Sequence, residues 1–253
     1  MADATIALEA TNIFGLPSGF NTTSSGINVV ETNVAVNDEV GNVECQRNIA
    51  DMINYSQSAT YCGTNFVGDI TTFLTQFGNA QTGTVTAVVT GISLSMSAQG
   101  YVTIDLTGHN HAENAHAAGL TLGYADVSDF LPHEAGEAFV AWDGFGVPDF
   151  GVTLGDNASP SGASVTFSMN HVDQIDESGD HLVGKNITPR CELSMDFIGV
   201  PTSSTASALE TDFDVNTNDM LSPLVDSFDT NASNSDFSTF AFVAHANTDL
   251  ASA

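Results

Sequence analysis

Basic residues are almost missing from this chain: Arg47, Lys185 and Arg190 are the only ones among 253 residues. They stand against 31 acidic residues, so the formal net charge is −28 at pH 7, although charged residues make up only 13% of the chain. A protein that grips nucleic acid needs many Lys and Arg side chains to displace counterions from the phosphates. This composition therefore excludes sequence-specific nucleic-acid binding. Adaptation to a salty habitat is one explanation of the charge.

Cysteines, long apolar runs and export signals are also scarce. The three cysteines, Cys45, Cys62 and Cys191, contain no CxxC pair and are odd in number, so no disulfide framework is predicted. The opening residues, MADATIALEA, lack the basic and apolar regions of a signal peptide. We therefore expect synthesis in a cytoplasm and no classical secretion. No run approaches 18 apolar residues, so no membrane insertion is expected.

The common catalytic signatures are absent from the sequence as well. It contains no GxSxG, Walker A, Rossmann, HExxH or cysteine-based catalytic motif. Carboxylates are plentiful, but no pattern marks a working pair. The sequence therefore predicts a protein that is not an enzyme and needs no cofactor.

Two runs of alternating residues between Val85 and His111 carry the strongest structural pattern in the chain. Apolar residues alternate with polar or small ones in each run, which is the period of a half-buried strand. Gln99-Gly100 separates the runs and supplies the glycine of a tight turn. The sequence therefore predicts a long two-stranded ribbon. Its apolar face needs a cover, because one hairpin buries too little surface to be stable.

More strands and one helix are predicted before this ribbon. Residues 27–36 alternate in part, residues 37–42 form a turn, and the chain pairs back from Val43, with a third strand expected at 52–61. The interval 65–77 predicts a helix that packs one apolar stripe on a sheet and ends at Gly78. The stripe consists of Phe66, Ile70, Phe73, Leu74 and Phe77.

A late pair of alternating segments, 164–171 and 190–199, completes the predicted fold. We expect this pair to cover the central ribbon as a second sheet. The result would be a mainly β fold, a β-sandwich or half-barrel with one flanking α-helix. The predicted organisation is an N-terminal arm at 1–26, a core at 27–201 with a loop insertion at 110–162, and a C-terminal extension at 202–253 with one or two short elements.

Two segments outside the predicted sheets carry apolar side chains. The N-terminal arm contains Ile13 and Phe14, and its Gly and Pro residues forbid a regular element. The loop insertion is unusually aromatic. We predict that both segments contact neighbouring copies of the chain, and packing on the parent core is the alternative. The aromatic residues concerned are Phe139, Trp142, Phe145 and Phe150.

Two groups of residues are weak candidates for a metal site. His109 and His111 point to the same side of a strand end near Glu113, a combination of ligands that suits a metal ion. The pair is similar to the start of a cupin motif, but the rest of that motif is missing. Asp212 and Asp214 have the alternate spacing of a calcium loop, without its central Gly and final Glu. We favour a polar strand end for the histidines and assign no metal.

The order of these elements resembles that of a known family. An extended arm is followed by a hairpin with the turn NDEVGNV and by one helix. The ribbon VTGISLSMSAQGYVTIDLTGHNH and the pair VTFSMNHVDQIDESGDHLVGKNITPRCELSMDFIG come next. Over about residues 5–200 the chain resembles the tail tube and related virion structural proteins of tailed bacteriophages.

The resemblance implies a structural protein without catalytic residues. Members of that family fold as a β-sandwich or half-barrel, and six copies form a ring whose strands complete an inter-subunit β-barrel. The rings stack into a tube through which DNA passes. The implied location is the phage tail of the virion, after synthesis in the host cytoplasm. The implied partners are the chain itself and other tail proteins, namely the tape measure, terminator and baseplate.

The acidic composition suits such a conduit, because an acidic, nearly Lys-free lining repels phosphate and lets a duplex slide without specific binding. Other hypotheses remain open. One is another phage tail or head-completion component, such as a tail terminator. A second is an extracellular filament or surface-layer subunit of a salt-adapted microbe, against which the missing signal peptide speaks. A third is a cupin-like enzyme, which only the histidine cluster favours.

Overall fold

A computed structural model describes residues 12–74, 80–82, 86–97, 100–111, 133–134, 158–175, 181–202, 204–205, 224–232 and 237–247. One helix, α1 (Phe66–Leu74), lies among the strands of this part of the chain. The strands are β1 (Phe20–Asn37), β2 (Val43–Tyr61), β3 (Ala80–Thr82), β4 (Thr86–Ser97), β5 (Thr103–His111), β6 (His133–Glu134), β7 (Ser159–Ile175), β8 (His181–Ile198), β9 (Leu224–Asn231) and β10 (Thr239–Asn247).

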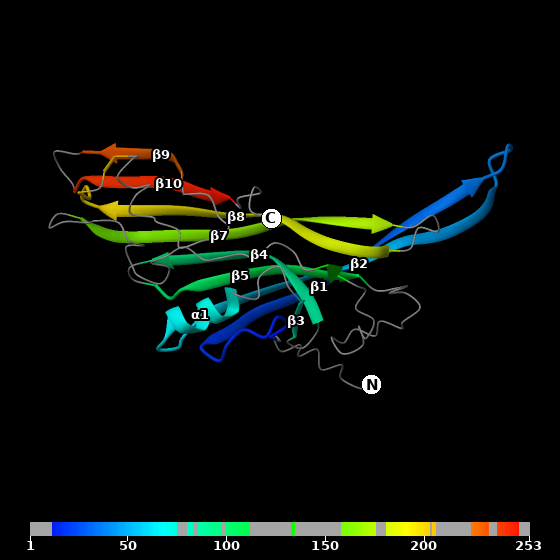
Figure 1. The fold of residues 1–253 in the computed structure, drawn as a ribbon, viewed down its shortest axis with the longest axis horizontal. Coiled ribbons are helices and arrows are strands. Elements are labelled where there is room, and N and C mark those ends of the chain that lie inside the picture. Colours follow the sequence, from blue (N-terminus) through cyan, green and yellow to red (C-terminus); the bar gives the residue numbers. More distant parts are fainter. Residues whose placement is uncertain are drawn as a thin grey trace, which may run out of the picture.

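All of these strands belong to one ten-stranded sheet (Figure 1). Its main path runs β1-β2-β5-β4-β7-β8-β10-β9, while β3 pairs with β4 and β6 pairs with β8 at the side. Every neighbouring pair along the main path is antiparallel. The prediction of a mainly β fold is therefore confirmed. β9 and β10, which come from the predicted C-terminal extension, are members of the same sheet.

The late pair of strands does not cover the central ribbon. β7 and β8 pair with each other, as predicted, but β7 is also hydrogen-bonded to β4 from Gly91↔Ser168 to Ser97↔Gly162. The pair therefore extends the sheet sideways, and the expectation of a second sheet stacked on the ribbon is wrong for β7 and β8. Alternation shows that one face of a strand is apolar, but it does not tell whether two such strands lie beside or above each other.

The local predictions agree better with the structure. β4 and β5 form the predicted central hairpin, and β1 and β2 form the predicted first hairpin. The first turn is closed by Asp38, whose N–H donates to the Asn42 carbonyl over 2.8 Å, and Gly41 has a φ of 90°. The predicted third strand is the second half of β2, which continues unbroken because residues 43–61 contain no Gly or Pro. The helix is confirmed, with its described part ending at Leu74.

The apolar core lies on one face of the sheet. Alternate residues of the inner strands are buried and their neighbours are more exposed. Ile70 and Phe73 of α1 pack into the same cluster, as do residues of the segment 12–20. The sheet contributes Ile53, Tyr55, Ala59, Ile92, Leu94, Ile104, Leu106, Val165, Phe167, Leu193, Met195, Phe197, Phe240 and Phe242.

A glycine on β5 allows the N-terminal segment to approach the sheet closely. The ring of Phe14 lies against Gly108, where an added Cβ would be 2.6 Å from Phe14 Cε1 and 2.5 Å from the Val88 carbonyl oxygen. Both distances are too short for any side chain. Gly108 is therefore required for Phe14 to occupy the core.

We predict that Gly108→Ala lowers the free energy of unfolding by about 1–3 kcal/mol, because the added methyl group overpacks the contact with Phe14. Gly162→Ala on β7 is the matched control, since a Cβ there would have its nearest neighbour at 3.6 Å. The control should change stability by about 0.5 kcal/mol or less. Urea unfolding measures both values, and equal small losses would contradict the packing of Phe14 on β5.

Candidate functional site

The histidine pair that was a weak candidate for a metal site lies at the end of β5. His109 is only 4% exposed and is paired with Asn54 on β2 and Val88 on β4, while His111 is paired with Met52. Within the described ranges, no group of three or more His, Cys, Asp or Glu side chains could hold a metal ion. Asp212 and Asp214, like Glu113, lie outside those ranges. The metal hypothesis thus gains no support from the geometry of β5.

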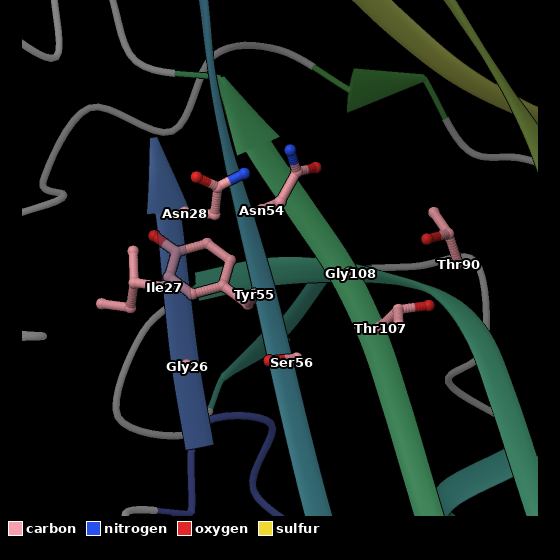
Figure 2. A pocket seen from close by; sticks show the side chains of 9 residues that line it. All are labelled: Gly26, Ile27, Asn28, Asn54, Tyr55, Ser56, Thr90, Thr107 and Gly108. Carbon is pink, nitrogen blue, oxygen red and sulfur yellow. The ribbon is translucent and has the colours of Figure 1, made fainter. Parts of the chain in front are cut away.

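A hollow of about 490 Å³ lies over β1, β2, β4 and β5. Figure 2 shows the amides of Asn28 and Asn54 toward one end of the hollow and the hydroxyl groups of Thr90 and Thr107 toward the other. The lining residues are Gly26, Ile27, Asn28, Asn54, Tyr55, Ser56, Thr90, Thr107 and Gly108, none of which is acidic, basic or histidine. Such a surface can form hydrogen bonds, but it offers no general acid or base for catalysis at neutral pH.

Two buried groups that could serve chemistry elsewhere are held in their neutral forms here. Burial raises the pKa of Tyr55 to about 12, and its hydroxyl donates to Asn110 Oδ1 over 3.5 Å. Burial, with a smaller effect of the Glu192 charge, raises the pKa of the fully buried Cys191 thiol. Neither side chain is therefore an activated nucleophile or base.

The N-terminal residues predicted to contact neighbouring copies are buried in their own chain. Ile13 is 0% and Phe14 is 1% exposed, and both belong to the core cluster. They leave no surface for a neighbouring chain, so the structure corrects the prediction for these two residues. The other predicted interface residues, Phe139, Trp142, Phe145 and Phe150, lie outside the described residues.

A buried glutamine on β2 holds this segment in place. Gln57 Oε1 accepts a hydrogen bond from the Phe14 N–H over 2.9 Å, and Gln57 Nε2 donates to Asn12 Oδ1 over 3.0 Å and to Thr22 Oγ1 over 2.9 Å. Asn12 in turn closes a small loop by accepting from the Leu16 N–H and donating to the Leu16 carbonyl, each over 2.8 Å. Three backbone groups of the segment, the Phe14 N–H and the N–H and carbonyl of Leu16, are thereby hydrogen-bonded.

The two lateral edges of the sheet are the most distinctive surfaces. Among the described residues, β1 pairs only with β2, and β9 pairs only with β10. β9 is exposed along nearly its whole length, including Phe228 at 45%, and only Val225 is half-buried. Neither strand contains Lys or Pro, the residues that commonly protect an edge. β9 nevertheless carries two carboxylates, Asp226 and Asp229, and a bulge, which also hinder pairing at an edge.

Two ribbons extend beyond the shared part of the sheet at the same end of the molecule (Figure 1). The β1–β2 ribbon comprises residues 31–51, because β2 pairs with β5 only from Met52 onward. The β7–β8 ribbon comprises residues 170–175 and 181–187, beyond the pairing of β7 with β4, and the short strand β6 pairs with it at Gly184 and Lys185. The tip of the first ribbon exposes three valines, Val36, Val40 and Val43, with Val40 at 79%.

We predict that Gln57→Leu lowers the free energy of unfolding by about 1–3 kcal/mol, because the Phe14 N–H would then be buried without an acceptor. Gln46→Leu, at an exposed position of the same strand, is the matched control and should change stability by about 0.5 kcal/mol or less. Thermal and urea unfolding measure the difference. A loss as small as that of the control would show that Gln57 does not anchor the segment.

In the described part of the chain, no helix is long and apolar enough to cross a membrane. No protein-family model matches the sequence, and no curated protein matches it either.

Proposed function

We propose that this protein is a structural subunit of a phage tail, a tail tube protein that self-assembles into stacked hexameric rings and forms an electronegative conduit for DNA. The observation that carries the proposal is the open sheet, whose two edge strands each pair on one side only among the described residues and contain neither Lys nor Pro. A monomeric protein would be expected to protect such edge strands from pairing with another chain. Closing the sheet through neighbouring copies removes them.

The strand order supports closure by a repeated head-to-tail contact. The main path contains an even number of strands with alternating direction, so β1 and β9 are antiparallel to each other. A second copy placed beside the first therefore brings its β1 next to β9 in an antiparallel orientation, with the apolar face still on the same side. Such a heterologous contact generates a ring when the rotation closes. A contact between two β9 strands would instead bring the Asp226 and Asp229 carboxylates of both copies together.

The exposed face of the central strands fits the lining of a DNA conduit. It is formed by hydroxyl and carboxylate side chains of β5, β7 and β8, with the basic residue Arg190 among them. Arg190 lies 3.6 Å from the carboxylate of Glu192, which offsets its charge. A surface of this kind does not attract the phosphate groups of DNA. The side chains concerned are Thr103, Asp105, Thr107, Ser164, Thr166, Ser168, Glu192, Ser194 and Asp196.

The two ribbons supply candidate contacts between rings, a role that the buried Ile13 and Phe14 do not fill. A two-stranded ribbon is marginally stable alone in water. The β1–β2 ribbon nevertheless carries apolar side chains at its tip, where they gain nothing from the parent core. A neighbouring copy that covers Val36, Val40 and Val43 would stabilise both the ribbon and the stack.

We predict that assembly increases with ionic strength. Each chain carries −28, so six copies carry six times −28, or −168, and their repulsion opposes ring formation. Raising NaCl from about 0.1 M to about 1 M shortens the screening length from about 10 Å to about 3 Å. Analytical ultracentrifugation and negative-stain images should show a shift from monomers to rings or tubes. MgCl₂ at matched ionic strength separates screening from cation bridging. A compact monomer at high protein concentration and high salt would contradict the proposal.

We predict that cysteines on β9 and β1 crosslink between copies. In a chain with Cys45→Ser and Cys62→Ser, Ser227→Cys on β9 would be combined with one cysteine on β1. Oxidation of assembled protein should give a ladder of covalent multimers on a non-reducing gel, because each copy supplies one edge to each neighbour. The positions to be tested in turn on β1 are Asn21, Ser24 and Asn28, which are exposed and lie on the same face of the sheet as Ser227.

The matched control for crosslinking pairs Ser227→Cys with Thr166→Cys, an exposed position on the interior strand β7. It should give no ladder, because β7 is already paired on both sides. Efficient dimers from Ser227→Cys alone would indicate a two-fold contact between β9 strands and would overturn the head-to-tail arrangement.

A further inference from the structure

The regular part of the edge strand β1 has the same length as the regular part of the edge strand β9. The pairing of β1 with β2 is irregular just before Ser24 and just after Val30, and it is continuous over the seven residues from Ser24 to Val30. β9 has eight residues, and its pairing with β10 skips Asp226, which is the extra residue of a bulge between Val225 and Ser227. All residues of β9 except Asp226 are therefore in regular positions, and the two open edges match in length.

Each of these two stretches exposes two large apolar residues among its described side chains, with exposed fractions between 37% and 55%. Ile27 of β1 and Phe228 of β9 lie on the core face of the sheet, because each is paired with a buried aromatic residue of the neighbouring strand. Val30 of β1 and Leu224 of β9 lie on the opposite face. Both edges thus expose one apolar side chain on each face of the sheet.

We propose that β9 of one copy pairs antiparallel with residues Ser24–Val30 of the next copy, with Phe228 opposite Ile27. The partner is a second copy of this chain, so this register rests on the proposed function. Because the bulge in β9 takes up one residue, the same register places Leu224 opposite Val30. All four exposed side chains then meet an apolar partner on the same face, and such cross-strand pairs stabilise a sheet.

Other registers lose these pairs. A shift by one residue reverses the two faces of one strand relative to the other, so that apolar side chains no longer meet. A shift by two residues toward the start of β1 places Phe228 opposite Ser25 and Leu224 opposite Asn28, which are polar. A shift by two residues in the other direction carries β9 across the irregularity that follows Val30.

The two carboxylates of β9, which would otherwise hinder pairing, fit this register. The carboxylate of Asp226 lies 2.8 Å from His245 Nδ1 on β10, so it is directed toward its own sheet and not toward the open edge. Asp229 would lie opposite Gly26, which has no side chain to collide with the carboxylate or to repel it. Neither acidic residue therefore meets a like charge or a bulky group across the contact.

Four exposed positions, combined in two ways, test the register. The matched combinations place two cysteines opposite each other on the face away from the core, whereas the exchanged combinations place the same cysteines four residues, or about 13 Å, apart. A disulfide does not form between Cα atoms more than about 7 Å apart. The matched combinations are Asn231→Cys with Ser24→Cys and Ser227→Cys with Asn28→Cys, and the exchanged ones are Asn231→Cys with Asn28→Cys and Ser227→Cys with Ser24→Cys.

We expect oxidation at high protein concentration and about 1 M NaCl, where repulsion between copies is screened, to give covalent multimers from both matched combinations and from neither exchanged one. All four chains also carry Cys45→Ser and Cys62→Ser, which leaves the buried Cys191 as their only other thiol. The two new cysteines of one chain cannot join each other, because β1 and β9 lie at opposite edges of the sheet. Circular dichroism verifies that each variant is folded.

The outcomes separate the register from the proposed function. Multimers from the exchanged combinations, or equal yields from all four, would overturn the register and leave edge-to-edge assembly standing. No covalent product from any combination would also overturn it, even in a sample whose negative-stain images show rings. Multimers from the matched combinations alone, in a sample without rings or tubes, would keep the register and reject the hexameric tube.

Discussion

Backbone hydrogen bonding across a single sheet is the interaction on which the rest of this structure depends. A strand directs its backbone groups to both sides, so each interior strand is complete only between two neighbours. The strands from β2 to β10 along the main path satisfy this requirement within the chain. The core follows from the same arrangement, since continuous pairing places the alternate apolar residues on one face, where α1 and the segment 12–20 pack. β1 and β9 are the places where the pattern stops, and the candidate functional surfaces are found there.

The net negative charge of the chain determines the ionic conditions under which the edges β1 and β9 could pair with neighbouring copies. A chain with three basic residues cannot neutralise a neighbour through many ion pairs, so contacts between copies in the proposed assembly would depend on backbone pairing and apolar side chains, which act at short range. Long-range repulsion opposes the approach that these contacts need. Two favourable charge contacts lie within the described residues. Arg190 meets Glu192 and His245 meets Asp226, and both pairs lie on the side of the sheet that ends in β9. In the proposed assembly, the balance between local attraction and overall repulsion would depend on the salt concentration.

Local elements were predictable from the sequence, and their lateral order was not. Asp38 and Gly41 identify the first turn, and the period of two identifies β4, β5, β7 and β8, because these signals depend on residues close in sequence. The position of β7 beside β4 depends on pairing between distant segments and left no local signal. The burial of Ile13 and Phe14 also depends on residues that are distant in sequence, Gly108 and Gln57. One signal was available: Gln57 interrupts the apolar series Ile53, Tyr55, Ala59 and Tyr61, and a polar residue at a buried position needs a specific partner. Nothing in the sequence marks the contact of His245 with Asp226, which depends on a bulge.

The unequal lengths of the edge strands have a further consequence. β1 contains 18 residues and β9 contains 8, so β9 of one copy can match less than half of β1 of the next. In the proposed assembly the unmatched part of β1 would include residues 31–37, which belong to the β1–β2 ribbon, and the β7–β8 ribbon projects in the same direction. In each proposed ring the two ribbons would therefore project from one rim, and no ribbon would project from the other. Layers with unlike rims stack in a single sense, so the resulting tube would have a distinguishable front and back, and its growth would be directional.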